Sequence, residues 1–114
     1  MKQDALEMSL LLDYYGELLS QKQQTCFDLY YNQDLSLSEI ADDLGISRQG
    51  VHDLLSRAEA QLAALERVTG CIARDRRIAR ALEEIESACI TLQSIPDARG
   101  AAQTILRAGA TIKE

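Results

Sequence analysis

The side chains best suited to specific binding chemistry lie along one segment of the chain. They are Arg48, Gln49, His52, Ser56 and Arg57. On a helix these positions share an outward side with Asp53. Arginine can donate two hydrogen bonds to guanine, glutamine can pair with adenine, and serine can contact a base or a phosphate. The pattern predicts a nucleic-acid-binding face, with Arg57 nearer the phosphate backbone. The simpler alternative is a solvated helix surface.

A second group of basic side chains follows further along the chain. It consists of Arg74, Arg76, Arg77 and Arg80. Such a cluster fits a phosphate-contacting patch for a folded RNA. The alternative is an ion-paired surface, because Arg80 can reach Glu83 or Glu84 at helical spacing. The formal net charge is −6, and residues 1–47 carry two lysines against nine acids. We therefore expect a polyanion to meet the middle or the C-terminal half of the chain.

The segment that positions the first face, residues 37–57, has the spacing of a helix-turn-helix. Ala41 is small where two helices would cross, and Gly45 suits the sharp turn between them. Ser36 and Ser47 are N-cap residues for the two helices. The positions that would lock the second helix over the first are apolar: Ile46, Val51 and Leu54.

The rest of the chain also favours helices, because it has only one proline and six glycines and lacks strand-type runs. Apolar spacing, caps and breakers predict helices over about 4–19, 21–31, 37–44, 48–69, 71–93 and 98–108. The fold class is therefore all-α. We expect a helix-turn-helix domain over residues 1–70, extended by a helical tail of the same domain over residues 71–114.

Two apolar seams run along the longest predicted helices. One spans Val51–Leu65 and the other Ile78–Leu92, each with residues spaced alternately three and four apart. The seams are too short for a free coiled coil, so they pack against each other or against a second subunit. We expect a homodimer that uses them.

The tyrosine pairs Tyr14–Tyr15 and Tyr30–Tyr31 have two interpretations. Adjacent helical residues point about 100° apart, so one tyrosine of each pair belongs to the core and the other is half-exposed. The hydroxyl groups then form ordinary hydrogen bonds at the domain surface. Alternatively, exposed rings near Lys22 stack on unpaired RNA bases.

Several classes of function are disfavoured by the composition. Three cysteines and a single histidine, without a C-x-x-C pair, provide neither a disulfide framework nor a zinc site. We also find no nucleophile with a histidine partner and no phosphate-binding glycine loop, so we expect no enzyme, metal or cofactor. No apolar run is long enough for a membrane span and no leader is evident, which favours the cytoplasm.

The N-terminal half carries a series of short motifs. They are Leu12-Asp13-Tyr14-Tyr15-Gly16, Leu18-Leu19-Ser20, Lys22-Gln23, Leu29-Tyr30-Tyr31, Asp34-Leu35-Ser36-Leu37, Glu39-Ile40-Ala41 and Ser47-Arg48-Gln49, followed by Val51 and Asp53. With these motifs, residues 6–57 resemble the YlxM family of small bacterial proteins, whose helix-turn-helix is like region 4 of sigma factors. The resemblance implies a cytoplasmic regulator encoded beside the signal recognition particle and its receptor.

The chain departs from that family pattern at three positions of the second helix. Gly50 stands where alanine is usual, His52 where tyrosine is usual, and Ser56 where lysine is frequent. Each change makes the helix less helical, less aromatic or less basic. We therefore favour a regulator in the signal recognition particle pathway that contacts its RNA or a protein component. The alternative is a transcriptional regulator that reads duplex DNA with the helix starting at Ser47.

Overall fold

The computed structural model describes residues 4–113 and divides the chain into two compact units. Unit 1 extends to Ile72 and unit 2 begins at Ala73. The helices of unit 1 are α1 (Ala5–Tyr15), η1 (Gly16–Leu18), α2 (Gln21–Phe27), η2 (Asp28–Asn32), α3 (Leu37–Leu44) and α4 (Arg48–Thr69). Then follow α5 (Cys71–Leu92), η3 (Pro96–Ala98) and α6 (Arg99–Lys113). Residues 4–113 contain no strand, which confirms the all-α fold class.

Local capping builds the helix-turn-helix as predicted. The Ser36 hydroxyl accepts a hydrogen bond from the Glu39 backbone N–H, and the Glu39 carboxylate accepts one from the Ser36 N–H. These hydrogen bonds to Ser36 lower the pKa of the Glu39 carboxyl. Gly45 ends α3 with φ +68°, a conformation that strains any residue with a side chain. Ser47 then caps α4 by accepting from the Gly50 N–H at 2.9 Å.

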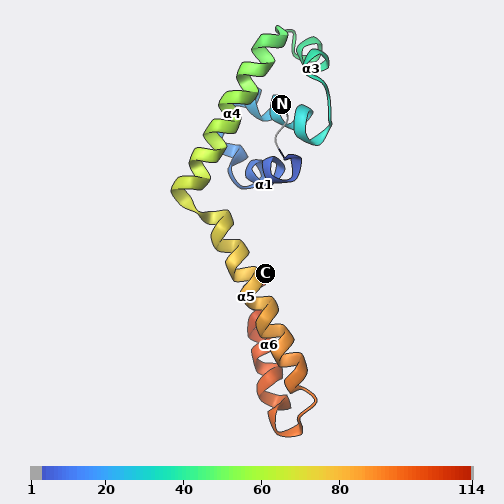
Figure 1. Cartoon of the computed structure of the whole chain (residues 1–114), viewed down its shortest axis with the longest axis vertical. Helices are drawn as coiled ribbons and strands as arrows, with labels where there is room; N and C mark the ends of the chain where they lie inside the picture. The colour runs from blue at the N-terminus through green and yellow to red at the C-terminus, as the bar shows by residue number, and fades with distance from the viewer. Residues whose placement is uncertain (1–3, 114) are drawn as a thin grey trace. The chain divides into compact units, whose positions relative to one another are not determined.

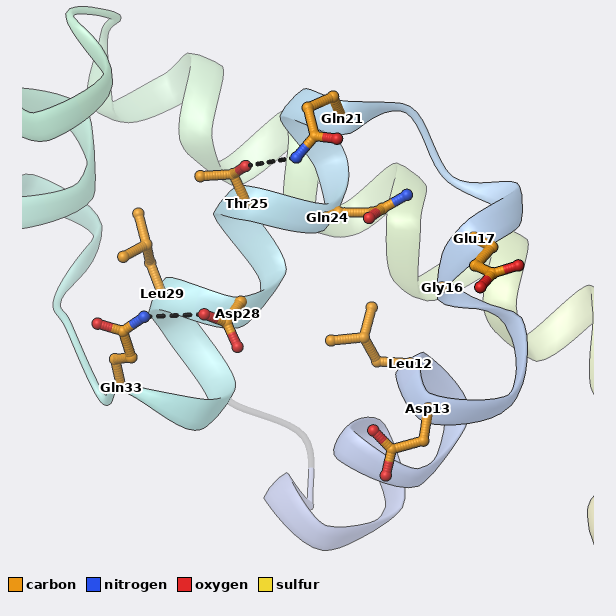
Figure 2. A pocket seen from close by; sticks show the side chains of 10 residues that line it. All are labelled: Leu12, Asp13, Gly16, Glu17, Gln21, Gln24, Thr25, Asp28, Leu29 and Gln33. Carbon is orange, nitrogen blue, oxygen red and sulfur yellow. Dashed lines mark hydrogen bonds between the residues drawn. The ribbon is translucent and has the colours of Figure 1, made fainter.

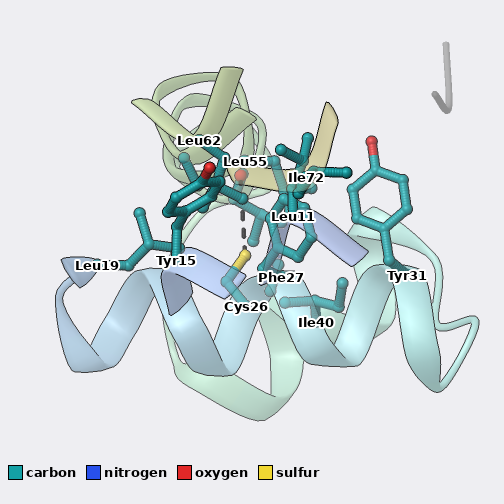
Figure 3. Close-up of a cluster of buried hydrophobic side chains, with 13 residues drawn as sticks. Leu11, Tyr15, Leu19, Cys26, Phe27, Tyr31, Ile40, Leu55, Leu62 and Ile72 are labelled. Atoms are coloured by element: carbon teal, nitrogen blue, oxygen red, sulfur yellow. Dashed lines mark hydrogen bonds between the residues drawn. The ribbon is translucent and has the colours of Figure 1, made fainter. Parts of the chain in front are cut away.

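Unit 1 has one apolar core, and α4 contributes to it along most of its length. In Figure 1, α1 and α3 lie against α4, and α2 also packs on it. Figure 3 shows Phe27, Ile40 and Leu62 converging in this core, where all three are fully buried. The seam residues Val51, Leu55, Ala58 and Leu62 are buried in the same cluster. The predicted use of this seam between subunits is therefore wrong, because unit 1 already covers it.

Two buried tyrosines tie α4 to the preceding helices by their hydroxyl groups. Tyr15 donates to the Glu66 carboxylate at 2.5 Å and lies 2.6 Å from the Thr69 hydroxyl, while Tyr31 donates to Glu59 at 2.5 Å. Burial, and then the bond to Glu66, raise the pKa of the Tyr15 phenol, so it remains a donor at neutral pH. Each tyrosine pair thus has one buried ring, as predicted.

Three helix ends differ from the sequence-based expectation. The first helix changes to a 3₁₀ turn after Tyr15, and the second continues from Asp28 as a π-helix. The last helix reaches Lys113 instead of ending near residue 108. Gly109, which lies just beyond the predicted end, is buried within α6, and a Cβ there would lie 3.7 Å from Leu82. Packing against α5 thus favours a helix that local propensity disfavours.

Unit 2 is a hairpin of two helices, α5 and α6, which lie side by side in Figure 1. Leu82 and Cys89 of α5 and Ala102 of α6 are its buried apolar side chains. Lys113 pairs with Glu86 at 2.6 Å, so the end of α6 lies beside the middle of α5 and the helices are antiparallel. Within residues 4–113, no helix has the length and hydropathy needed to cross a bilayer.

Candidate nucleic-acid interface

The first turns of α4 present the five side chains of the first predicted nucleic-acid-binding face. Arg48, Gln49, His52, Ser56 and Arg57 are all exposed. They share this surface because Val51 and Leu55 point into the core and fix the rotation of the helix. We call this surface the α4 face.

Asp53 lies among these residues and interacts with two of them. The Gln49 side-chain amide donates to the Asp53 carboxylate at 3.0 Å. The His52 ring nitrogen Nδ1 lies 3.8 Å from the same oxygen, and both side chains are more than half exposed. This bond occupies one of the two amide hydrogens with which Gln49 could contact adenine. The carboxylate also opposes the approach of phosphates to the two arginines.

A second carboxylate beside the α4 face was missed by the sequence reasoning. Glu59 is half-buried, and together with His52 and Ser56 it lines a small pocket of about 80 Å³. The available signal was its spacing of three residues after Ser56, which places both on the same side of a helix. The Tyr31 hydroxyl donates a hydrogen bond to the Glu59 carboxylate. This bond compensates the carboxylate for the water contact that it loses on burial.

The arginine cluster occupies the first half of α5 in unit 2. Arg74, Arg76, Arg77 and Arg80 are exposed. Helix geometry turns Arg76, Arg77 and Arg80 away from α6, and directs Arg74 more to one side of the hairpin. Arg80 lines a shallow groove with Glu83 and Glu84, so carboxylates border the patch as expected from their spacing.

Unit 1 also contains an acidic groove of about 510 Å³, shown in Figure 2. Asp13 and Glu17 line it from α1 and η1, and Asp28 lines it from the opposite wall. Asp28 accepts hydrogen bonds there from the side chains of Asn32 and Gln33. The negative lining is suited to a cationic group and repels a phosphate backbone.

The cysteines are arranged as packing residues rather than as a site. Cys26 is fully buried beside Val51, and burial raises the pKa of its thiol, which disfavours the reactive thiolate. Cys89 of α5 is buried on the side that packs on α6, whereas Cys71 is exposed. In the described part of the chain, no group of three or more His, Cys, Asp or Glu side chains could hold a metal ion.

Comparison with known proteins identifies relatives along most of the chain. Residues 2–98 match the UPF0122 family, described as "Putative helix-turn-helix protein, YlxM / p13 like". The chain is 46% identical over 86 residues to a UPF0122 protein of Thermoanaerobacter sp. (strain X514), covering 75% of this chain and 74% of that protein.

Two further relatives match the chain at similar identity. A UPF0122 protein of Symbiobacterium thermophilum is 45% identical over 85 residues, covering 75% of this chain and 79% of the relative. One of Acetivibrio thermocellus is 42% identical over 97 residues, covering 82% of this chain and 83% of the relative. Together with the capped pair α3–α4, these matches show that the chain belongs to the UPF0122 family of YlxM/p13-like helix-turn-helix proteins.

Proposed function

We propose that this protein is a non-enzymatic, cytoplasmic regulator that binds the RNA of the signal recognition particle. The helix-turn-helix family supports a regulatory role with nucleic acid. The YlxM resemblance connects that role to protein targeting. In this proposal the arginine cluster of α5 contacts phosphates, and the protein acts as a homodimer.

The observation that favours RNA over duplex DNA is the engagement of Asp53. Its carboxylate accepts the Gln49 amide at 3.0 Å, at the centre of the surface that would enter a major groove. Duplex binding by this helix would bring the negative charge of Asp53 between two phosphate strands. The arginines of α5 are exposed, and folded RNA can be recognised through its phosphates and its shape.

The test is a titration of the full-length protein, followed by fluorescence anisotropy. The protein is added to signal recognition particle RNA and to pooled duplex fragments at about 50 and 200 mM salt. We expect tighter binding to the RNA and a steep dependence on salt. Charge reversal in the double variant Arg76→Glu/Arg77→Glu should weaken RNA binding at least tenfold and flatten the salt slope.

A matched control changes the same total charge elsewhere. Arg67 and Arg107 are exposed arginines outside the cluster, and the variant Arg67→Glu/Arg107→Glu should retain most of the RNA affinity. Equal losses in both double variants would mean that only net charge matters, which contradicts a specific patch. If the protein binds neither nucleic acid, the RNA-binding proposal is refuted, and a basic protein partner that binds the acidic groove is favoured.

Duplex DNA is the second candidate, favoured by the exposed Arg48 at the first position of α4. In this alternative the α4 face reads bases, and Arg48→Ala abolishes sequence selectivity. Asp53→Asn keeps the shape of the side chain, removes its charge and should strengthen duplex binding. Unchanged duplex affinity in both variants would exclude this face as a DNA-reading surface.

A further inference from the structure

Unit 2 buries only a narrow line of residues between its two helices. Leu82 and Cys89 of α5 face Ala102 and Gly109 of α6. The small residues of α6 let the helices approach closely, and Glu86 and Lys113 close one edge with their ion pair. This line uses one side of α5 and leaves a second apolar seam outside the contact.

That second seam on α5 is exposed and has regular spacing. It consists of Ile78, Ala81, Ile85, Ala88 and Leu92, which follow one another at intervals of three and four. A matching exposed seam on α6 consists of Ala101, Ile105, Ala108 and Ile112. The five large side chains are between 37% and 63% exposed, which is unusual for aliphatic residues at heptad spacing.

Both seams lie on the same side of the hairpin. At about 100° per residue, both seams are rotated in the same sense, by roughly 40–120°, from the buried residues Leu82 and Ala102, and in antiparallel helices such positions emerge on the same side. Ile78 of α5 and Ile112 of α6 line one pocket, so the two seams come close together at this end of the hairpin. The two seams therefore form one continuous surface, which we call the aliphatic face.

The aliphatic face has the composition of a helical bundle interior. Its nine residues are isoleucine, leucine and alanine, and none of them is charged. Its large side chains expose on the order of 400 Å² per copy, which is within the range of the largest apolar patch on a typical monomer, a patch that is often functional. Charged side chains border the face at one end, where Arg74, Asp75, Glu83 and Lys113 line the same pocket as Ile78 and Ile112.

We propose that a second copy of this chain docks on the aliphatic face, so that two hairpins form a four-helix bundle. A unit of about 40 residues rarely buries enough surface to be stable alone, and oligomerisation is the usual remedy. Isoleucine alternates with alanine along both seams, so the surface offers ridges and holes that can fit a copy of itself.

The size of the face agrees with such a dimer. Two copies would cover about 800 Å² from the large side chains alone, and the alanines and the rim bring the total toward the 1,200 Å² at which stable interfaces begin. This inference specifies the interface of the homodimer in the proposed function. It replaces the seam Val51–Leu65, which is buried in the core of unit 1, by a surface that the packing of α5 on α6 leaves exposed.

Sedimentation equilibrium of the full-length chain tests the interface. Reductant is present, because the exposed Cys71 could otherwise link copies by a disulfide. The wild type should have twice the mass of one chain, and Ile85→Glu/Ile105→Glu should reduce it to one. The matched control is Ile90→Glu/Ala110→Glu, which adds the same charges to exposed positions on the opposite side of the hairpin and should remain dimeric.

A second measurement keeps the proposal testable if the double variant unfolds unit 2. Amide hydrogen exchange of the wild type is followed over a roughly hundredfold dilution. Protection of α5 and α6 should fall on dilution, while that of α2 and α4 stays constant. A wild type that is monomeric at every concentration, or a control that dissociates as readily as Ile85→Glu/Ile105→Glu, would overturn the proposal.

The outcome is independent of the nucleic-acid experiment. The variant Arg76→Glu/Arg77→Glu should remain dimeric, because neither arginine belongs to the aliphatic face. A monomeric wild type that still binds RNA through these arginines would refute the dimer and leave the RNA-binding role standing. A dimer that binds no RNA would support the dimer interface and refute the RNA-binding role.

Discussion

The two units of this protein bury their apolar residues to very different extents. In unit 1, four helices share a core with fully buried large residues such as Phe27, Ile40 and Leu62. In unit 2, two helices meet along small residues and leave Ile78, Ile85 and Ile112 substantially exposed. Both units use similar amphipathic helices, so the number of surrounding helices decides whether an apolar seam is covered.

The units also differ in their polar contacts. In unit 1, Tyr15 and Tyr31 donate from buried rings to glutamates of α4 that are more than 25 residues away in sequence. In unit 2, the ion pair between Glu86 and Lys113 is solvated, and exposed pairs of this kind contribute little. We therefore expect unit 1 to be the more rigid part of each chain.

The largest effect should come from truncating the centre of unit 1. Phe27→Ala removes a fully buried ring and should lower the free energy of unfolding of unit 1 by about 3–5 kcal/mol. Urea denaturation followed by circular dichroism measures the change. Leu6→Ala, at an 84% exposed position of α1, should change nothing measurable. Equal losses in the two variants would contradict the described core.

Removing a polar contact should have an intermediate effect on stability, and the effect should be larger in unit 1 than in unit 2. Tyr31→Phe leaves the half-buried Glu59 without its phenol donor and should cost about 1–2 kcal/mol. Lys113→Ala removes the exposed ion pair with Glu86 and should cost less than about 0.5 kcal/mol. Both values come from denaturation curves of the intact protein. A larger loss of stability in Lys113→Ala than in Tyr31→Phe would contradict this difference between the units.

The smallest expected effect is a gain in the stability of unit 2. Gly109→Ala places a methyl group 3.7 Å from Leu82, which is ordinary contact, and should stabilise α6 by about 0.5–1 kcal/mol. Gly50→Ala should gain less, because its methyl group would lie 3.2 Å from the hydroxyl oxygen of the capping Ser47. Thermal denaturation compares the two variants. Destabilisation by Gly109→Ala would mean that the hairpin is packed more tightly than described.

Much of the fold could be predicted because its signals are local. The serine caps of α3 and α4 and the glycines that end them act within four residues, so the boundaries of both helices followed from the sequence. The exposed residues of the α4 face followed from the same periodicity. Less predictable were the bond between Gln49 and Asp53 and the position of Glu59, since both depend on side-chain conformation and on neighbouring helices.

By itself, the sequence determined the helical class, the helix-turn-helix and the family to which the chain belongs, because caps, turns and periodic apolar residues act over short distances. Only the tertiary structure decided which apolar seams are covered. The seam of α4 is covered by α2 and α3, whereas that of α5 splits into a side that packs on α6 and a side that is exposed. Burial depends on which helices meet, and that is a property of the packed molecule rather than of any one segment.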